Sequence, residues 1–429
     1  MKMEQSYDVI IIGSGPAGLG AAFAILDKKP ETSILILEKG TTSSGGLRND
    51  CKMNFTFPIG FPEDNWTREE AEVYLEEVSR KLTPPIKEKN NLTIYQKRAE
   101  RLGSALLNIR QAHLGTDGGL ELIHNLTKEL ESRGVEIRTG VTAGMAGLES
   151  RILKTTVGDF SFRKLLAAPG RQGFNYLQEL MEGLGIDYVD HVVDVGIRVE
   201  TKLENYPIVK DYYDPKFHFP DRVRTFCTNS GAAFVVKEKY TAQDGRSFPS
   251  VNGHAWSERR EQNGLVNFAM LKTIRLTEPL ASGQRYAEML GLQADLLGGG
   301  KPIMQRVGDF RLGQRSKVAS FNSDLFDFEP TLKGCTPGDI SLAMPAKILR
   351  SIWKSMKILD TIIPGVLHPS TIMYYPEIKL YANKPAFIDQ NFKVKDGIWM
   401  AGDGAGTSRG ITAAWAAGVR AARGILEEL

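Results

Sequence analysis

The chain has few of the residues that metal centres and disulfide chemistry require. Three cysteines and six histidines occur among its 429 residues, and Cys51, Cys227 and Cys335 lie far apart. The lack of a Cys-x-x-Cys pair argues against a disulfide reductase. The histidines show no spacing such as His-Glu-x-x-His, so we expect no metal site. Scattered cysteines are typical of a reducing compartment, which predicts a cytoplasmic protein.

A strong charge bias and long apolar runs are also missing. Lys and Arg number 54 against 51 Asp and Glu, so the formal net charge is only +3. No stretch is apolar for long enough to cross a bilayer, and no secretory signal pattern is present. We therefore expect neither nucleic acid nor a membrane as a partner. The length predicts two or more domains.

The most informative stretch that is present runs from Tyr7 to Gly18. An apolar run leads into a Gly-x-Gly-x-x-Gly turn, and small residues follow at helical length. A second apolar run at 34–37 ends in Glu38, 20 residues after Gly18. Strand, glycine turn, helix, strand and acid together form the dinucleotide-binding fingerprint. The binding residues predicted from it are Gly13, Ser14, Gly15, Pro16, Ala17, Gly18 and Glu38.

Each part of this fingerprint has one physical task. Gly13 permits a tight turn, Gly15 lets a pyrophosphate approach the backbone, and Gly18 allows close packing of helix on strand. The helix N-terminus presents free N–H groups and a positive dipole end to the anion. The Glu38 carboxylate would accept hydrogen bonds from ribose hydroxyls. These residues alone fit either NAD or FAD.

A second glycine-rich motif lies near the other end of the chain. A short apolar run at 398–401 precedes a Gly-Asp turn, a glycine-rich loop and an Ala/Gly helix to about Leu426. This motif resembles the second FAD motif of the glutathione-reductase-like flavoprotein superfamily. The resemblance implies FAD as cofactor, a hydrogen bond between the ribityl chain and Asp403, and a helix N-terminus facing the N1/C2=O edge of the flavin. The residues implied are Gly402, Asp403, Gly410, Ile411 and Thr412.

Three further segments match positions that contact FAD in that superfamily. The loop after Glu38 would run beside the pyrophosphate and ribityl groups, and the strand near 134–141 would end where the backbone brackets adenine. An Ala-Pro-Gly turn at 168–170 resembles the superfamily's Ala-Thr-Gly turn, with Pro169 in place of the threonine. The residues implied are Lys39, Gly45, Gly46, Leu47, Val141, Ala168 and Gly170.

The periodicity changes near residue 193, where apolar and polar residues begin to alternate. Alternation predicts a half-buried strand of an antiparallel sheet. We therefore predict an α/β protein with a FAD-binding Rossmann-like domain at 1–193 and 366–429, which includes a helical excursion at about 63–103. A mixed α+β substrate domain with an antiparallel sheet would occupy 194–365. The chain would return to the first domain through strands near 372–375 and 380–381.

Four stretches, at 168–171, 194–200, 251–254 and 375–379, resemble a little-characterised family of FAD-dependent dehydrogenases. The resemblance implies an oxidoreductase but no particular substrate. Candidate catalytic residues are Asn252 and His254, expected in a polar turn, and Cys227. His254 titrates in the range of a general acid, although a surface histidine and a buried thiol are equally compatible. Arginines that could bind a substrate anion, or form salt bridges, are Arg171, Arg306, Arg311 and Arg315.

These residues predict hydride transfer between flavin N5 and an organic small molecule, either as C=C reduction or as dehydrogenation. No second Gly-x-Gly-x-x-Gly follows a strand, so we predict no dedicated NAD(P) domain. The electron donor or acceptor would be NAD(P)H that binds transiently, or another carrier. Alternatives are a tRNA-modifying flavoprotein, a flavin monooxygenase and a non-catalytic flavin-binding carrier.

Overall fold

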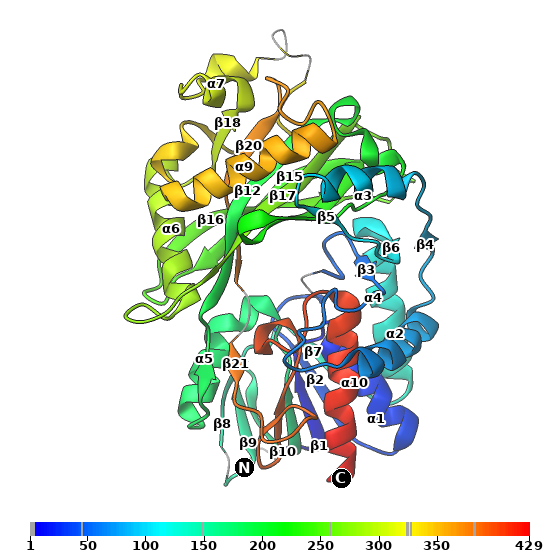
Figure 1. The fold of residues 1–429 in the computed structure, drawn as a ribbon. Helices are drawn as coiled ribbons and strands as arrows, with labels where there is room; N and C mark the ends of the chain where they lie inside the picture. Colours follow the sequence, from blue (N-terminus) through cyan, green and yellow to red (C-terminus); the bar gives the residue numbers. More distant parts are fainter. Residues whose placement is uncertain are drawn as a thin grey trace. The chain divides into compact units, whose positions relative to one another are not determined.

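The computed structural model describes residues 5–43, 46–147, 149–257, 259–322, 326, 328–380 and 383–429. The chain divides into two compact units, which are drawn in Figure 1. Unit 1 comprises 1–86, 109–190 and 381–429, and unit 2 comprises 87–108 and 191–380. Both units combine helices with sheets, so the predicted mixed α/β class is confirmed.

Unit 1 is built around a parallel sheet. Its strands lie in the order β23-β10-β1-β2-β7, and each neighbouring pair in this series is parallel. Their apolar side chains are buried on both faces, as a parallel sheet covered by helices requires. These strands are β1 (Gln5–Ile12), β2 (Ile34–Glu38), β7 (Glu136–Thr139), β10 (Gly158–Ala167) and β23 (Ile398–Met400). The Rossmann-like arrangement of unit 1 follows from this order.

Short antiparallel strands extend the edges of this sheet. β22 (Lys393–Lys395) pairs with β23, while β8 (Ala143–Ala146) and β9 (Ile152–Thr155) continue from β10. A separate three-stranded sheet has the order β3 (Lys52–Asn54), β6 (Gln111–His113) and β4 (Ile86–Lys87), in which β3 and β6 are antiparallel. An antiparallel pair joins β11 (Tyr188–Val189) to β21 (Lys384–Pro385).

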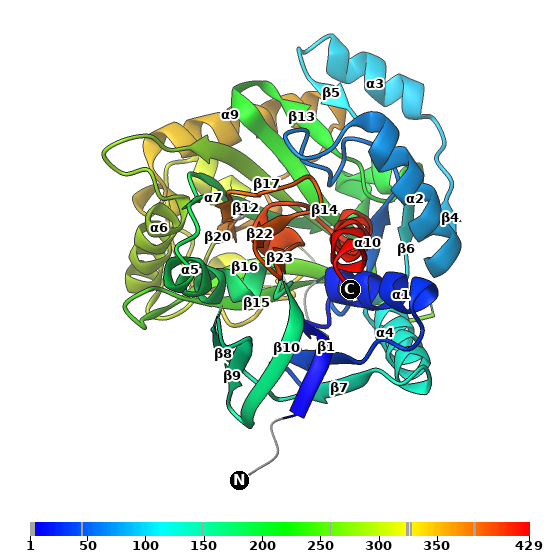
Figure 2. The same cartoon turned by 90° about the horizontal axis from the view of Figure 1, so that it is seen from below.

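Helices cover both faces of the parallel sheet. One hydrophobic core includes residues of α1 (Pro16–Lys28), α2 (Arg68–Leu82), α4 (Gly115–Ser132) and α10 (Ile411–Glu427), and the other includes α5 (Phe174–Gly183). Figure 2 shows α1 and α10 side by side on one face. The rings of Phe23 in α1 and Trp415 in α10 stack with centroids 5.8 Å apart.

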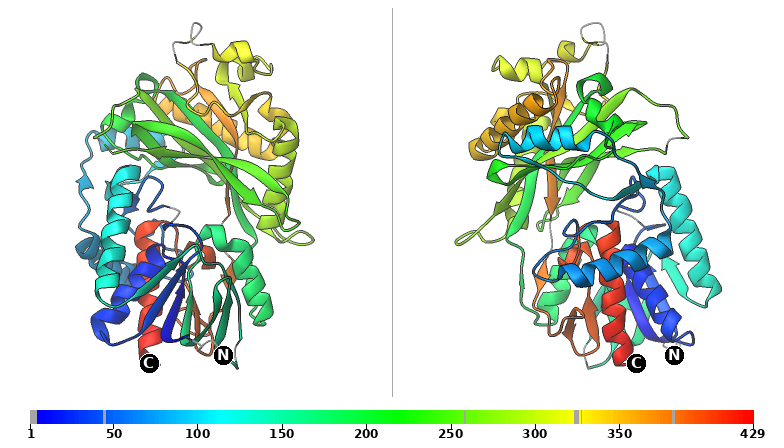
Figure 3. Two further views of the ribbon diagram at one scale, coloured as in Figure 1. Left: turned by 180° about the vertical axis from the view of Figure 1, so that it is seen from behind. Right: turned by 45° about the vertical axis from the view of Figure 1, so that its right-hand side comes forward.

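Unit 2 contains a largely antiparallel sheet of eight strands, seen from two sides in Figure 3. Their order is β19 (Thr336–Pro337), β18 (Ile303–Arg306), β20 (Ile372–Leu380), β12 (Val192–Lys202), β17 (Leu265–Arg275), β14 (Val223–Gly231), β13 (Phe217–Phe219) and β5 (Ala105–Leu106). A two-stranded sheet pairs β15 (Ala233–Thr241) with β16 (Ser247–Ala255). The helices are α3 (Leu92–Glu100), α6 (Gly283–Gly298), α7 (Val307–Arg311) and α9 (Ala346–Ile362).

The boundaries of the two units differ from the predicted ones at two places. Residues 87–108 lie in unit 2 because β5 pairs with β13 and Arg98 donates to the Ile362 carbonyl. β20, which was expected to lead back into the first domain, pairs with β12 and β18 in unit 2. The chain therefore re-enters unit 1 after Leu380 rather than near 366.

Candidate dinucleotide-binding site

The β1–α1 turn contains two kinds of glycine. Gly13 has φ +100°, and a Cβ there would lie 2.3 Å from the Ala168 carbonyl oxygen. A Cβ on Gly18 would lie 2.0 Å from the Gly13 carbonyl oxygen. Gly15, by contrast, has an ordinary φ of −73°, and no described atom beyond its chain neighbours lies within 4 Å of an added Cβ. Gly13 and Gly18 thus permit packing, whereas Gly15 borders open space at the N-terminus of α1.

Glu38 is fixed beside this turn. Its Oε2 accepts hydrogen bonds from the Ser14 backbone N–H (3.1 Å) and hydroxyl (2.7 Å), and its Oε1 accepts one from the Gly40 N–H at 2.9 Å. The Glu38 residue is only 8% exposed. A carboxylate has about four lone-pair sites, so acceptor capacity remains for ribose hydroxyls.

Asp403 organises the turn that follows β23. Its carboxylate accepts from the Ser408 hydroxyl at 2.8 Å, and the Gly410 N–H lies 3.1 Å from both of its oxygens. Arg171 Nε lies 3.9 Å from Asp403 Oδ2. Burial raises the pKa of Asp403, and the nearby positive charge of Arg171 opposes that rise. Asp403 therefore holds the loop in place directly before α10.

Helices α1 and α10 approach each other closely through small residues. A Cβ on Gly418 would lie 1.9 Å from the Ala17 carbonyl oxygen, and one on Gly402 would lie 3.2 Å from the Ala17 Cβ. The two helices begin at the carboxyl ends of parallel strands, since α1 follows β1 and α10 follows β23. Two positive helix ends consequently open toward the same edge of the sheet.

The β10 turn completes this edge. Gly170 has φ +65°. Apart from chain neighbours, no described atom lies within 4 Å of a Cβ added at Gly170, and the same is true at Gly410. A Cβ on Gly404 would lie 2.4 Å from the Gly170 carbonyl oxygen, so the turns after β10 and β23 touch. Ala168 is buried and donates its N–H to the Ile12 carbonyl.

The backbone N–H of Val141, the residue predicted to contact adenine, is already used in a hydrogen bond within the fold. Its N–H donates to the Glu38 carbonyl at 3.0 Å. This bond leaves the Val141 carbonyl as the backbone group that could meet an adenine. A bond from the Val141 N–H to adenine would therefore require the end of β2 to rearrange.

The loop after Glu38 places its predicted residues differently from one another. Lys39 and Gly46 are exposed, whereas the Leu47 side chain is fully buried in the core. Gly45 lies outside the described residues.

Ser43, which was not predicted from the sequence, is 2% exposed, and its hydroxyl has no partner among the described residues. A buried hydroxyl without a partner is uncommon and fits a group that a ligand would satisfy. The only signal in the sequence was the run of four hydroxyl residues, Thr41 to Ser44, that follows shortly after Glu38.

The segment before α2 anchors the turn at 402–410 from outside. Trp66 Nε1 donates to the Thr407 carbonyl at 2.7 Å, and the Arg409 N–H donates to the Gly60 carbonyl at 2.8 Å. Thr412 donates its hydroxyl to the Asn54 carbonyl at 2.5 Å, and Ile411 is buried. Thr412 and Ile411 can thus offer a ligand their backbone N–H groups rather than their side chains.

In unit 2, the predicted polar turn around Asn252 is wrong. Asn252 and His254 lie within β16, which pairs with β15 along its whole length. Asn252 accepts from Arg198 Nη2 at 3.1 Å and donates to Glu238 Oε1 at 2.7 Å. Gly253, which suggested a turn, instead lets Arg198 and Asn267 approach, because a Cβ there would lie 2.7 Å from Arg198 Nη1.

Asn252 belongs to a buried ionic network centred on Arg198. Arg198 and Glu377 are both fully buried and form a bidentate pair, with Nε–Oε2 at 2.8 Å and Nη2–Oε1 at 2.5 Å. Arg198 Nη1 also donates to the Cys227 carbonyl at 2.9 Å. Lys379 Nζ lies 3.3 Å from Glu377 and 3.4 Å from Glu238. The pair lies in two of the stretches that carried the family resemblance, 194–200 and 375–379, but neither residue was selected from the sequence.

Cys227 and His254 have different surroundings. Cys227 has φ +49° at an irregularity where the register between β14 and β17 shifts after Phe226. The His254 ring contacts those of Phe234 and Trp256, with centroids 5.7 and 5.6 Å away. The structure thus brings Asn252 and Cys227 together around Arg198. Catalytic roles for Cys227, Asn252 and His254 remain predictions.

Arg306, a candidate for binding a substrate anion, is instead buried and hydrogen-bonded within unit 2. It is 1% exposed and donates to the backbone carbonyls of Ser320, Phe328 and Ser370. Its guanidinium also lies 4.9–5.0 Å from three phenylalanine ring centroids. Arg311 and Arg315, in contrast, are exposed.

The described residues contain neither a cluster of metal ligands nor a helix suited to the interior of a bilayer. No three His, Cys, Asp or Glu side chains gather there as ligands of a metal ion would. In the same part of the chain, no helix has the length and apolar character needed to cross a bilayer.

No family model matches the chain. An uncharacterised protein from Clostridium beijerinckii is 23% identical over 467 aligned residues, which cover 98% of this chain and 80% of that protein. The name of this relative gives no activity.

Several solved structures share a weak overall likeness. The 3-ketosteroid-Δ4-(5α)-dehydrogenase from Rhodococcus jostii, in complex with 4-androstene-3,17-dione, has a TM-score of 0.44 and 12% identity, covering 99% of this chain and 98% of that one. A ternary complex of aklavinone-11 hydroxylase with FAD and aklavinone scores 0.39 at 11% identity, covering 95% and 58%. THI4 from Thermovibrio ammonificans scores 0.29 at 15% identity, covering 43% and 64%. The chain thus spans less than two thirds of the last two proteins.

Proposed function

We propose that the chain is a FAD-dependent oxidoreductase. The observation that carries this proposal is the convergence of two glycine turns and two helix N-termini at one edge of the parallel sheet of unit 1. Gly15, Gly170 and Gly410 leave space that a Cβ would fill, although other glycines of the same turns are tightly packed. NAD needs only the first turn, whereas an extended FAD would use both.

Residues of unit 1 would hold the two halves of the cofactor. The β1–α1 turn, Glu38 and the Ser43 hydroxyl, which has no partner among the described residues, suit a pyrophosphate and a ribose. Asp403 and the turn from Gly402 to Gly410 suit the ribityl chain. FAD would supply two-electron chemistry at flavin N5. The first N–H groups of α10 would stabilise the negative charge that reduction creates.

Unit 2 would supply the surface that binds an organic small molecule. Support comes from its separate sheet and from the group formed by Asn252, Cys227 and Arg198. The Arg198–Glu377 pair fixes the strands that carry this group, so Arg198 is a positioning residue. The electron partner would be NAD(P)H or another carrier, and the hydride could pass in either direction.

Two measurements test this function. The purified protein should be yellow, and the compound released on denaturation should be identified as FAD by chromatography and mass. Recovery of NAD, or failure to take up FAD on reconstitution, would contradict the cofactor. Anaerobic mixing with a metabolite library, followed by flavin bleaching, then tests catalysis. A protein that binds FAD but is reduced by neither metabolites nor NAD(P)H would not be this oxidoreductase.

A further inference from the structure

Unit 2 has an unusual concentration of protruding apolar side chains. Among the large hydrophobic residues that the structure describes, the four most exposed are Leu296 (82%), Val318 (81%), Leu312 (72%) and Leu342 (67%). All four come from a short stretch of one unit. We call these four residues the apolar edge.

Hydrogen bonds hold the segments that carry the apolar edge next to one another. The Thr336 hydroxyl donates to the Gly298 carbonyl at 2.6 Å, which ties β19 to the end of α6. The Ser316 N–H donates to the Gly338 carbonyl at 3.0 Å, and Gln293 Nε2 lies 3.5 Å from the Leu342 carbonyl oxygen. The segments that carry the four residues are therefore neighbours in the fold, although the residues span positions 296 to 342 of the sequence.

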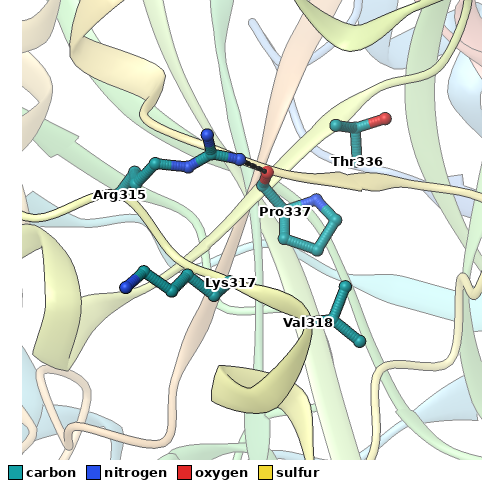
Figure 4. Close-up of a pocket in the computed structure, with 5 residues that line it drawn as sticks. All are labelled: Arg315, Lys317, Val318, Thr336 and Pro337. Carbon is teal, nitrogen blue, oxygen red and sulfur yellow. Dashed lines mark hydrogen bonds between the residues drawn. The ribbon is translucent and has the colours of Figure 1, made fainter.

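A shallow pocket lies within this surface and is shown in Figure 4. Arg315, Lys317, Val318, Thr336 and Pro337 line it. Arg315 points toward the Pro337 carbonyl, to which its Nη2 donates at 3.2 Å, whereas Lys317 extends away from Pro337. The segment from 311 to 318 thus carries three cations, Arg311, Arg315 and Lys317, together with the aliphatic side chains of Leu312 and Val318.

Helix α9 adds a row of cations. Lys347, Arg350, Lys354 and Lys357 are all exposed, and their spacing of three and four residues places them on one face of the helix. The Phe310 and Trp353 rings, 4.7 Å apart, join α7 to α9. None of the salt bridges between described residues includes these four cations or Arg311, Arg315 and Lys317. We call these seven residues the basic face.

We propose that the apolar edge and the basic face dock the protein peripherally on an anionic phospholipid bilayer. Single aliphatic side chains that protrude between cations match an interfacial contact, because the aliphatic groups enter the acyl boundary while the cations meet lipid phosphates. The core of a protein–protein interface is instead depleted in lysine and enriched in aromatic residues. A surface for single-stranded RNA would need exposed aromatic rings for stacking. The small net charge of the whole chain gives no sign of this patch, because 51 acidic residues nearly balance 54 basic ones over the full sequence.

The proposal is tested by flotation of the holoprotein with vesicles. Phosphatidylcholine vesicles with and without phosphatidylglycerol are compared at low and high salt. Binding should require the anionic lipid and should weaken as salt rises. The double variant Lys347→Gln/Lys354→Gln should lower the partition coefficient by about 30-fold, if each cation contributes as basic residues near a membrane usually do. Leu312→Ser/Val318→Ser should also release the protein.

Matched controls lie in unit 1. Ile388 is 64% exposed and Lys128 is exposed on α4, so Ile388→Ser and Lys128→Gln change the same residue types outside the patch. Both controls should bind vesicles as wild type does. The proposal is overturned if wild type does not float with anionic vesicles, or if the patch variants bind like the controls. It is also overturned if the leucine–valine variant only dissociates a dimer, which would make this surface a contact between two copies.

Discussion

Among single residues, the glycines of the candidate site show why a motif must be read position by position. A Cβ added to Gly13 or Gly18 would lie only 2.3 or 2.0 Å, respectively, from a backbone carbonyl oxygen. The fold itself therefore requires glycine at both positions. A Cβ added to Gly15 would meet no described atom within 4 Å beyond its chain neighbours, so packing does not explain why this residue is a glycine. A substitution at Gly15 therefore separates cofactor binding from folding.

We predict that Gly15→Val abolishes FAD retention but leaves the apoprotein folded. The valine methyl groups would occupy the space left for a pyrophosphate, while the cost to the helix start should be about 1 kcal/mol or less. The flavin-to-protein ratio and the thermal unfolding of the apoprotein measure the two effects. Gly18→Val is the contrasting variant and should unfold unit 1. A Gly15→Val protein with normal flavin content would contradict the assignment.

Glu200 gives a prediction about pH. It is fully buried, accepts a hydrogen bond from the Tyr374 hydroxyl at 2.5 Å, and also bonds the Thr331 hydroxyl. Burial raises the pKa of Glu200, so the folded protein keeps this proton to a higher pH than the unfolded chain does. The free energy of unfolding should therefore fall as pH rises through the raised pKa. Glu200→Gln should flatten this slope in urea titrations across that range, and an unchanged slope would assign it to other groups.

Some single residues could be predicted from the sequence, and others could not. Gly13, Gly18 and Glu38 fell where the strand, turn and acid spacing required them. Asn252 was misplaced because Pro249 and Gly253 suggest a turn, whereas Gly253 is needed for close approach to Arg198. Ser43 was missed because only a structure shows that a hydroxyl is buried without a partner.

Among the elements, the contact between α1 and α10 matters most to unit 1. It brings helices from opposite ends of the sequence to one face of the sheet, and Gly418 lies against the Ala17 carbonyl. Local sequence predicted both helices, but their contact depends on residues separated by most of the chain.

Gly418→Ala should destabilise unit 1 by about 1–3 kcal/mol, because the added methyl group must push the two helices apart. Urea unfolding monitored by circular dichroism measures the change. Gly298→Ala in α6 is the matched control, since its added Cβ meets only the Ile303 side chain at 3.6 Å. If both variants changed the free energy of unfolding equally, the α1–α10 contact would accommodate the added methyl group without loss of stability.

The strands of unit 2 depend on the buried pair of Arg198 and Glu377. Arg198→Met leaves a buried carboxylate without its main partner and should cost about 3–5 kcal/mol. The double variant Arg198→Met/Glu377→Leu removes both charges and should recover much of that loss. Chemical unfolding of the three proteins measures the coupling. Additive losses would mean that the two side chains act independently.

The sequence predicted β1, α1, β2 and β12 well because their periodicity and turn residues agree. It did not predict that β20 belongs to unit 2, since a buried strand has the same apolar character in either sheet. The segment 87–108 was assigned to the first domain for a similar reason. Its nine-residue helix α3 has only one buried residue, Ala99, and so carries little pattern.

For the whole molecule, cofactor binding should stabilise unit 1 selectively. Removing FAD should lower its unfolding free energy by about 2.7 kcal/mol relative to a solution with free FAD at 100 times Kd. Hydrogen exchange should therefore quicken in peptides from 9–28 and 398–425, while peptides from β12 and β17 should change little. Equal loss of protection in both units would contradict a site built from unit 1 alone.

The interrupted layout of unit 1 also has a consequence for the order of events on the ribosome. The β1–α1–β2 segment emerges early, but β23 and α10 are synthesised only after all of unit 2. At elongation rates of about 5–20 residues per second, the nascent chain spends many seconds with the apolar flank of α1 uncovered. A chaperone that shields this flank during translation would therefore help the newborn protein more than one that acts after release.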